Sequence, residues 1–287
     1  FSIDILLIKN SLHFVDGIFL IALSSLLIGI MGTVPGHELV HRKKNKLDMQ
    51  MGNWLLALSW DCAFAVEHVY GHHKNVGLDK DPATAKRGEN IYAFIFKAIK
   101  NEQVGAWNIE RARLKMNKSS FLSFKNRMIT GYLRSILISG LSYYVGGFSG
   151  LLTFLLCSFI AKSLLEVINF TEHYGLVRVE GQPVMPHHSW NTNSFISSIY
   201  LYNVTRHSSH HEKAHLKYWE LRPYVDAPTM PQGYLSMLYL AIFLPGIFKK
   251  IMVNKLIDWD KNYATDDERK LSSIQNKNSN MPLLLNH

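Results

Sequence analysis

Two apolar runs without charge constrain the fold of this chain more than any other feature. Residues 17–35 and 135–161 contain no Lys, Arg, Asp or Glu. An uncharged run of about 20 residues is long enough to cross a bilayer as a helix. The alternative is a buried core helix, but helices of soluble domains rarely extend so far without a polar face. The runs therefore predict an all-α, integral membrane protein.

The apolar pattern also predicts where the chain turns. A first spanning helix is expected over residues 14–34, loosened at Pro35-Gly36. The segment 128–170, about 43 residues, is long enough for two crossings at 1.5 Å per residue, and the glycines at 146–150 predict the turn between them. Segment 51–66 is predicted to be an interfacial or re-entrant helix. Segment 234–248, with a break at Pro245-Gly246, is predicted to be a short re-entrant or spanning helix. About three to four spanning helices result.

The remaining segments carry weaker signals. Residues 91–124 are mixed in character and predicted to be helical. The polar chain after Trp259 has few apolar residues, so residues 269–287 are predicted to be a disordered tail. Residues 1–268 are expected to form one membrane-embedded domain.

The charge pattern favours a membrane protein over a nucleic-acid-binding one. The net charge is +9, and basic residues gather beside the apolar segments, as on the cytoplasmic side of membrane proteins. These residues are Arg42, Lys43, Lys44 and Lys46 after the first run, and Lys249 and Lys250 after the last. No nucleic-acid-binding motif accompanies them. Cys62 and Cys157 both lie in apolar stretches, so neither a disulfide framework nor an electron-carrying CxxC pair is expected.

Nine of the fourteen histidines fall in four short clusters at the ends of apolar segments. The clusters read HELVH, EHVYGHH, NFTEHYG and RHSSHH. Neutral imidazole binds iron, copper or zinc, and a single ion needs three or four ligands. Nine histidines therefore suit two ions. If they share metals, the clusters must lie on one membrane face, which excludes a full crossing between His41 and His68.

The HELVH motif leaves a different class of enzyme open. It places His37 and His41 at i and i+4 on one helix face, as in zinc metalloproteases, where Glu38 would be the general base. A zinc protease would need one further ligand, not seven. A metal-storage or sensor role is a weaker alternative.

The motifs and their flanking segments resemble the membrane alkane monooxygenases, or alkane omega-hydroxylases, of the integral-membrane fatty acid desaturase/hydroxylase superfamily. HELVHR, EHVYGHH, NFTEHYGL and RHSSHH match that family's histidine motifs in order and spacing. DPATAKRGENIY, AWNIERARLK, HSWNTN, LRPYVDAPTMPQGY and DWDKNYAT are similar to further family segments. The resemblance spans roughly residues 15–268.

This resemblance implies a non-haem diiron enzyme that hydroxylates the terminal carbon of a medium- or long-chain alkane with O2. It implies two iron ions, electrons from rubredoxin and rubredoxin reductase, and a multi-pass position in the bacterial inner membrane with the metals on the cytoplasmic side. No catalytic residue beyond the metal ligands is implied. The implied ligands are His37, His41, His68, His72, His73, His173, His207, His210 and His211. A fatty acid desaturase or an alkyl-aromatic, xylene-type monooxygenase of the same superfamily is the nearest alternative.

Several acidic residues are candidates for orienting these imidazoles, as partners of ligating histidines normally do. Glu166 lies seven residues before His173 and shares its helix face. Other candidates adjoin or follow the ligands: Glu38, Glu67, Glu172 and Asp81. His188, in the HSWNTN segment, is expected to support the site. Family members carry further N-terminal helices, so the chain is expected to be N-terminally truncated.

Overall fold

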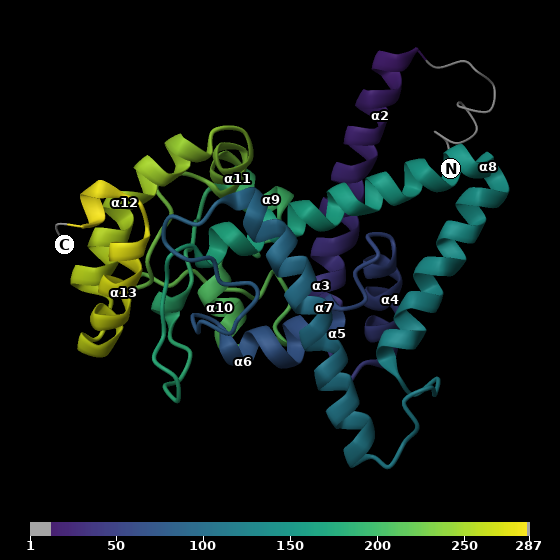
Figure 1. The fold of residues 1–287 in the computed structure, drawn as a ribbon, viewed down its shortest axis with the longest axis horizontal. Coiled ribbons are helices and arrows are strands. Elements are labelled where there is room, and N and C mark those ends of the chain that lie inside the picture. The colour runs from purple at the N-terminus through teal and green to yellow at the C-terminus, as the bar shows by residue number, and fades with distance from the viewer. Residues whose placement is uncertain (1–12, 286–287) are drawn as a thin grey trace. The chain divides into compact units, whose positions relative to one another are not determined.

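The computed structural model describes residues 13–285, and these residues form an all-helical fold (Figure 1). No strand forms within them, and a single isolated bridge joins Asn191 to Thr229. The α-helices are α2 (Phe14–Leu27), α3 (Val34–His41), α4 (Lys46–Ala57), α5 (Phe64–Glu67), α6 (His73–Asn75), α7 (Ile91–Met116), α8 (Arg127–His173), α9 (Phe195–Tyr200), α10 (His207–Glu212), α11 (Tyr234–Phe243), α12 (Pro245–Asn262) and α13 (Asp266–Asn278). Ile28–Thr33 and His68–His72 are π-helical, and Pro186–His188 and Pro282–Leu284 are short 3₁₀ turns. The predicted all-α class is confirmed for the described residues.

These residues form two compact units. The first unit comprises residues 13–69 and 103–165, and the second comprises residues 70–102 and 166–285. Helices α7 and α8 each contribute residues to both. The HELVH histidines and His68 belong to the first unit, and the other ligand candidates belong to the second.

In the first unit, α2 and α3 form one continuous apolar helix over Phe14–His41. The prediction that Pro35-Gly36 loosens this helix is wrong in position, because Pro35 lies in the first turn of α3. The irregularity lies one turn earlier, in the π-helical segment Ile28–Thr33. Proline cannot donate to the carbonyl four residues before it and clashes with it, and a π-bulge relieves both problems.

Helix α8 contains the predicted hairpin. Its helical conformation breaks at Gly147, where φ is 59° and ψ is −152°, a combination open to glycine but hardly to other residues. The break falls within the predicted 146–150 turn. Arg127–His173 and Phe14–His41 are the two described stretches long and apolar enough to cross a membrane.

The segment 51–66 is not one helix, and its predicted boundaries are wrong. Helix α4 ends at Ala57, and α5 begins at Phe64. Between them the chain turns with a positive φ of 56° at Trp60, and Asp61 Oδ1 accepts the backbone N–H of Phe64. A polar turn in this place agrees with the expectation that the segment does not cross fully.

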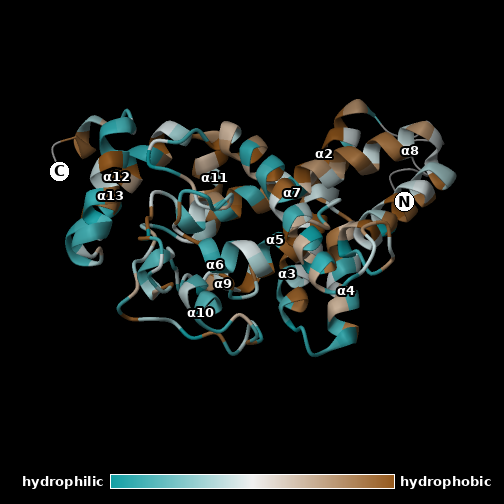
Figure 2. Cartoon of the chain, turned by 60° about the horizontal axis from the view of Figure 1, so that its bottom comes forward, coloured by the Kyte–Doolittle hydropathy of each residue, from teal (hydrophilic) through white to brown (hydrophobic). Residues whose placement is uncertain are grey.

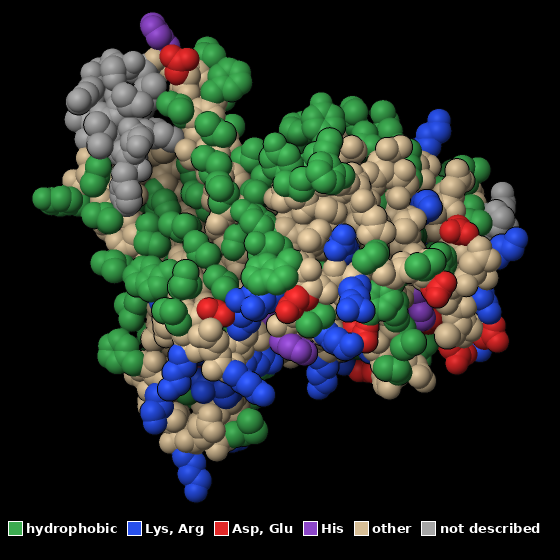
Figure 3. Space-filling model, turned by 180° about the vertical axis from the view of Figure 1, so that it is seen from behind, with side chains coloured by type: hydrophobic (Ala, Val, Ile, Leu, Met, Phe, Trp, Pro, Cys, Tyr) green, Lys and Arg blue, Asp and Glu red, His purple; other side chains and the backbone are tan. Residues whose placement is uncertain are grey.

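Apolar side chains cover the outer surfaces of α2 and α8. Both helices are strongly apolar along their length (Figure 2), and many of their Phe, Leu, Ile and Tyr side chains are exposed. In Figure 3 these side chains gather over the same helices, whereas Lys and Arg gather at one end of them. Buried residues of α4, α5 and α8, such as Leu56, Phe64 and Leu165, pack together inside the first unit.

In the second unit, aromatic rings hold the end of α8. Phe170 packs on Tyr174 and Phe248, with ring centroids 5.0 and 5.5 Å away. The predicted break at Pro245-Gly246 separates α11 from α12. Residues 91–116 of the predicted 91–124 helix form α7, and the following residues form a turn.

The expectation of a disordered tail does not hold for residues 269–285. Helix α13 covers most of them, capped by Thr265 and Glu268 in a capping box, and it buries Glu268, Ser272 and Asn276. Polar contacts rather than apolar burial hold this helix in place. The low apolar content of the segment therefore led to a wrong prediction of disorder.

Candidate metal centre

Four histidines of the second unit come together from three parts of the chain. His72 ends the π-helical turn, His173 ends α8, and His207 and His211 lie at i and i+4 on α10. One ring nitrogen of each lies within 4.8 Å of the others. The Nε2 atoms of His173 and His211 each lie 3.0 Å from Nε2 of His207.

The other ring nitrogens show which tautomer these histidines adopt. His173 Nδ1 lies 3.0 Å from the backbone oxygen of His188, and a carbonyl can only accept. His72 Nδ1 lies 3.0 and 3.1 Å from the two Asp81 carboxylate oxygens, and Glu172 Oε1 lies 3.2 Å from His207 Nδ1. Nδ1 of His72 and of His173 therefore carries the proton, and Nε2 of each is left with its lone pair. Four imidazoles with ring nitrogens within 4.8 Å of one another form a donor set that fits a metal ion.

A second group, of three histidines, lies in the first unit. His37 and His41 occupy one face of α3, and His68 follows α5. Their candidate ligand atoms also lie within 4.8 Å of one another. The Phe64 ring stacks on His68 at 4.2 Å with an interplanar angle of 12°, which restricts the orientation of that imidazole.

Behind Phe64 lies a buried ion pair. Lys162 Nζ lies 2.9 Å from Asp61 Oδ2 and 5.7 Å from the centroid of the Phe64 ring. The pair anchors the turn before α5 to α8 and so supports the position of His68.

The last two ligand candidates form a pair in the second unit. His73 Nε2 and His210 Nε2 lie 3.0 Å apart. The structure thus groups the nine predicted ligands as four, three and two within the units. A further cluster consists of His187, His188 and Glu268. Neither His187 nor Glu268 was named in the sequence analysis; the T-x-x-E signature at 265–268 marks Glu268 as part of a helix cap but does not indicate its contact with His188.

Comparison with known proteins places this arrangement in a family. Residues 13–241 match the family model described as fatty acid desaturase. The chain belongs to the fatty acid desaturase family. It is 35% identical to alkane 1-monooxygenase 1 of Pseudomonas aeruginosa over 87% of its own length and 65% of that enzyme. The corresponding values for alkane 1-monooxygenase 2 of that species are 34%, 86% and 66%.

A relative named for a different substrate is similar to about the same degree. The chain is 34% identical to the xylene/toluene monooxygenase hydroxylase component of Pseudomonas putida, over 88% of the chain and 68% of that protein. The chain spans about two thirds of the length of these curated relatives. The resemblance to the alkane monooxygenases, inferred from the histidine motifs, is confirmed by these relatives.

The acidic residues that sequence reasoning paired with the desaturase-family histidines lie in different places. Asp81 and Glu172 contact ligand candidates, as described above. Glu38 instead pairs with Arg42, one helix turn away. Glu67 is buried with its side chain against Gly105, and Glu166 is buried and accepts a hydrogen bond from Asn169 at 3.2 Å.

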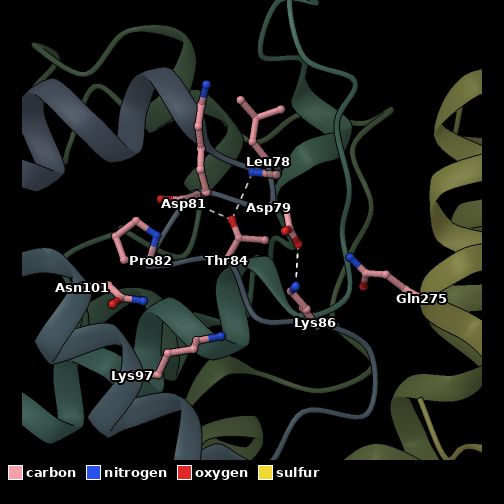
Figure 4. A pocket seen from close by; sticks show the side chains of 11 residues that line it. Leu78, Asp79, Asp81, Pro82, Thr84, Lys86, Lys97, Asn101 and Gln275 are labelled. Atoms are coloured by element: carbon pink, nitrogen blue, oxygen red, sulfur yellow. Dashed lines mark hydrogen bonds and ion pairs between the residues drawn. The ribbon is translucent and has the colours of Figure 1, made fainter. Parts of the chain in front are cut away.

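Asp81 also lines a small polar cavity of about 120 Å³ (Figure 4). Thr84 donates a 2.6 Å hydrogen bond to Asp81 Oδ2, and Lys86, Lys97 and Asn101 lie around the same cavity. Burial raises the pKa of Asp81, but the electrostatic effect and the hydrogen bond of the His72 imidazole, together with the Thr84 hydroxyl, outweigh it and lower the pKa overall. The carboxylate is therefore ionised at neutral pH and suited to hold an imidazole N–H.

His211 is held in the form that binds metal. Burial first, and then the neighbouring imidazoles of His73 and His207, lower the pKa of His211 well below its ordinary value. A neutral imidazole has a lone pair for a metal ion, whereas a protonated one has none.

Proposed function

We propose that the chain forms the metal-binding part of a membrane-bound, non-haem diiron monooxygenase that converts a medium- or long-chain alkane into a 1-alkanol. The observation that carries the proposal is the four-histidine group, in which ring nitrogens of all four residues lie within 4.8 Å of one another and His72 and His173 carry their protons on Nδ1. The two alkane 1-monooxygenases of Pseudomonas aeruginosa to which the chain is similar support the choice of reaction.

We propose that the nine histidines of the four motifs ligate two iron ions. His72, His173, His207 and His211 provide a complete set for one ion, and His37, His41 and His68 provide the core of a set for the other. His73 and His210 are the remaining proposed ligands. Bound iron would supply the activation of O2, from which one oxygen atom enters a C–H bond and the other leaves as water.

The protein's own side chains would orient these ligands. We propose that Asp81, Glu172 and the His188 carbonyl hold the imidazole rings by their Nδ1 protons. We propose that Glu38, Glu67 and Glu166 support the helices that carry the ligands, through contacts such as Glu38 with Arg42 and Glu166 with Asn169.

We propose that the apolar helices cross the bacterial inner membrane several times, with the histidines on the cytoplasmic side. In the most apolar window of Phe14–His41 only 11% of the residues are buried within the protein, which favours contact with lipid over the buried-core alternative. The basic residues after His41 support the orientation. We propose that residues 1–268 act as one such domain, which takes its alkane from the bilayer and its electrons from rubredoxin.

The test is to purify the chain from membranes, measure its metal content and supply an alkane, O2, rubredoxin and rubredoxin reductase. Iron and a 1-alkanol are the expected results. A benzylic alcohol formed from xylene, with none formed from the alkane, would favour the alkyl-aromatic alternative, which the xylene/toluene relative supports. A double bond in an acyl chain would indicate a desaturase, and zinc without any alkanol would contradict the proposal.

A zinc protease built on HELVH makes a different prediction about the distant histidines. His207→Ala and His210→Ala should leave its metal content intact, whereas the diiron proposal expects both variants to lose iron. His215→Ala is the matched control, because His215 is exposed and outside the histidine groups. Metal analysis of the three variants distinguishes the two enzyme classes.

A further inference from the structure

The contacts of His173 continue beyond its immediate partner. Its Nδ1 donates to the backbone oxygen of His188. The His188 ring in turn has two fixed contacts: Nδ1 accepts the backbone N–H of Met185 at 2.9 Å, and Nε2 lies 2.6 Å from Glu268 Oε1. Since Nδ1 accepts, Nε2 carries the proton and donates to the carboxylate.

Glu268 also forms hydrogen bonds with Thr265. Its Oε2 accepts the backbone N–H of Thr265 at 2.8 Å and the Thr265 hydroxyl at 3.0 Å, which closes the capping box of α13. His187 Nε2 lies 3.3 Å from the same oxygen. Both carboxylate oxygens thus have hydrogen-bond donors from the protein, so the cluster is accounted for by hydrogen bonds without a third metal ion.

Buried side chains also hold the backbone of the Pro186–His188 turn, since Ser208 Oγ donates to the Pro186 carbonyl at 2.6 Å. His188 is 1% exposed and Glu268 is 3% exposed. Trp259 on α12 holds the backbone, with Nε1 donating to His187 O at 2.6 Å. Rotation of the His188 ring out of its pocket would move the carbonyl that orients His173.

We propose that Glu268 is a positioning residue for the metal centre, acting through His188 on His173 and so linking the folding of α13 to metal retention. The inference rests on the proposed function, because it takes His173 to be a ligand. By linkage, iron bound at His173 must stabilise the docked form of α13 to the same extent as docked α13 stabilises the bound iron.

The experiment measures the rate at which an iron(II) chelator removes iron from the purified full chain. Glu268→Ala is expected to raise this rate about tenfold, the lower end of the effect of groups that orient metal-ligating histidines. Thr265→Ala is the matched control, since it weakens the same cap but leaves Glu268 on His188. It should speed amide hydrogen exchange in α13 and release iron close to the wild-type rate.

A double-mutant cycle separates positioning from a general loss of stability. If Glu268 acts through His188, the variant carrying both Glu268→Ala and His188→Ala should release iron no faster than His188→Ala alone. Additive effects, or equal release from Glu268→Ala and Thr265→Ala, would overturn the proposal, as would loss of one extra bound metal ion from Glu268→Ala.

The release assay does not depend on which substrate is oxidised. If the wild type forms no alkanol but Glu268→Ala still releases iron faster, the alkane reaction fails and the positioning role stands. If alkanol forms and the release rates are equal, the positioning role fails alone.

Discussion

At the scale of single residues, the metal centre depends on what each histidine does with the nitrogen that does not bind metal. In His72, His173 and His207 this nitrogen lies beside a carboxylate or a backbone carbonyl. These partners orient the rings, and the Nε2 atoms of His173 and His207 lie 3.0 Å apart. Losing such a partner should weaken metal binding without removing a ligand.

Asp81 offers the sharpest test of this point. Asp81→Asn keeps the size of the side chain but loses the charge that holds His72, and we expect iron affinity to fall roughly 10- to 100-fold. Asp79→Asn is the control, since Asp79 is two residues away with an 82% exposed side chain that pairs with Lys86. Competition with a metal-sensitive dye measures both affinities. Equal affinities for the two variants would contradict the role of Asp81.

Asp81 was a candidate from sequence because it follows the EHVYGHH cluster, and the structure brings it to His72. Adjacency in sequence was a poorer guide for Glu38. Neighbours on a helix point about 100° apart, so Glu38 leaves the face of His37 and His41 and meets Arg42 four residues later. The contact of Glu268 with His188 could not be predicted from the sequence, because the two residues lie 80 positions apart in the chain.

At the scale of elements, apolar patterning predicted the long helices well and the polar ones badly. The first apolar helix and the α8 hairpin follow directly from uncharged runs and a glycine-rich turn. Helix α13 has no such signal, because its residues are mostly polar and its position depends on contacts such as Arg87 with Asn276 at 2.7 Å.

The α8 break predicts opposite effects for two glycines of one helix. Gly147 has a positive φ, so Gly147→Ala should destabilise the protein by about 1–3 kcal/mol. Gly140 has helical geometry and nothing within 4 Å of an added Cβ, so Gly140→Ala should stabilise it by roughly 0.5–1 kcal/mol. Thermal unfolding in detergent micelles compares the two. Equal shifts would show that the hairpin does not require glycine at the break.

At the scale of the molecule, separate segments of the second unit meet at one buried side chain, Arg87. Its guanidinium contacts Asp260 through two nitrogens, at 2.5 and 2.7 Å, and also reaches Asn276. Its Nε donates to the backbone oxygen of Gly175 at 2.9 Å. Arg87 therefore joins α12 and α13 to the chain just after His173, in a geometry that a planar guanidinium can satisfy and an ammonium cannot.

Removing this side chain should affect both stability and metal retention. Arg87→Ala leaves Asp260 without its buried partner, and we expect a loss of about 3–5 kcal/mol in the free energy of unfolding. Arg87→Lys should recover only part of it, because the bidentate contact is lost. Iron release should also accelerate, since Gly175 lies two residues after His173. Lys86→Ala is the control: its side chain is 50% exposed and pairs with Asp79, so its effect should stay within about 0.5 kcal/mol. Denaturant unfolding and chelator release measure the two effects, and an Arg87→Ala variant as stable as Lys86→Ala would show that Arg87 does not hold the second unit together.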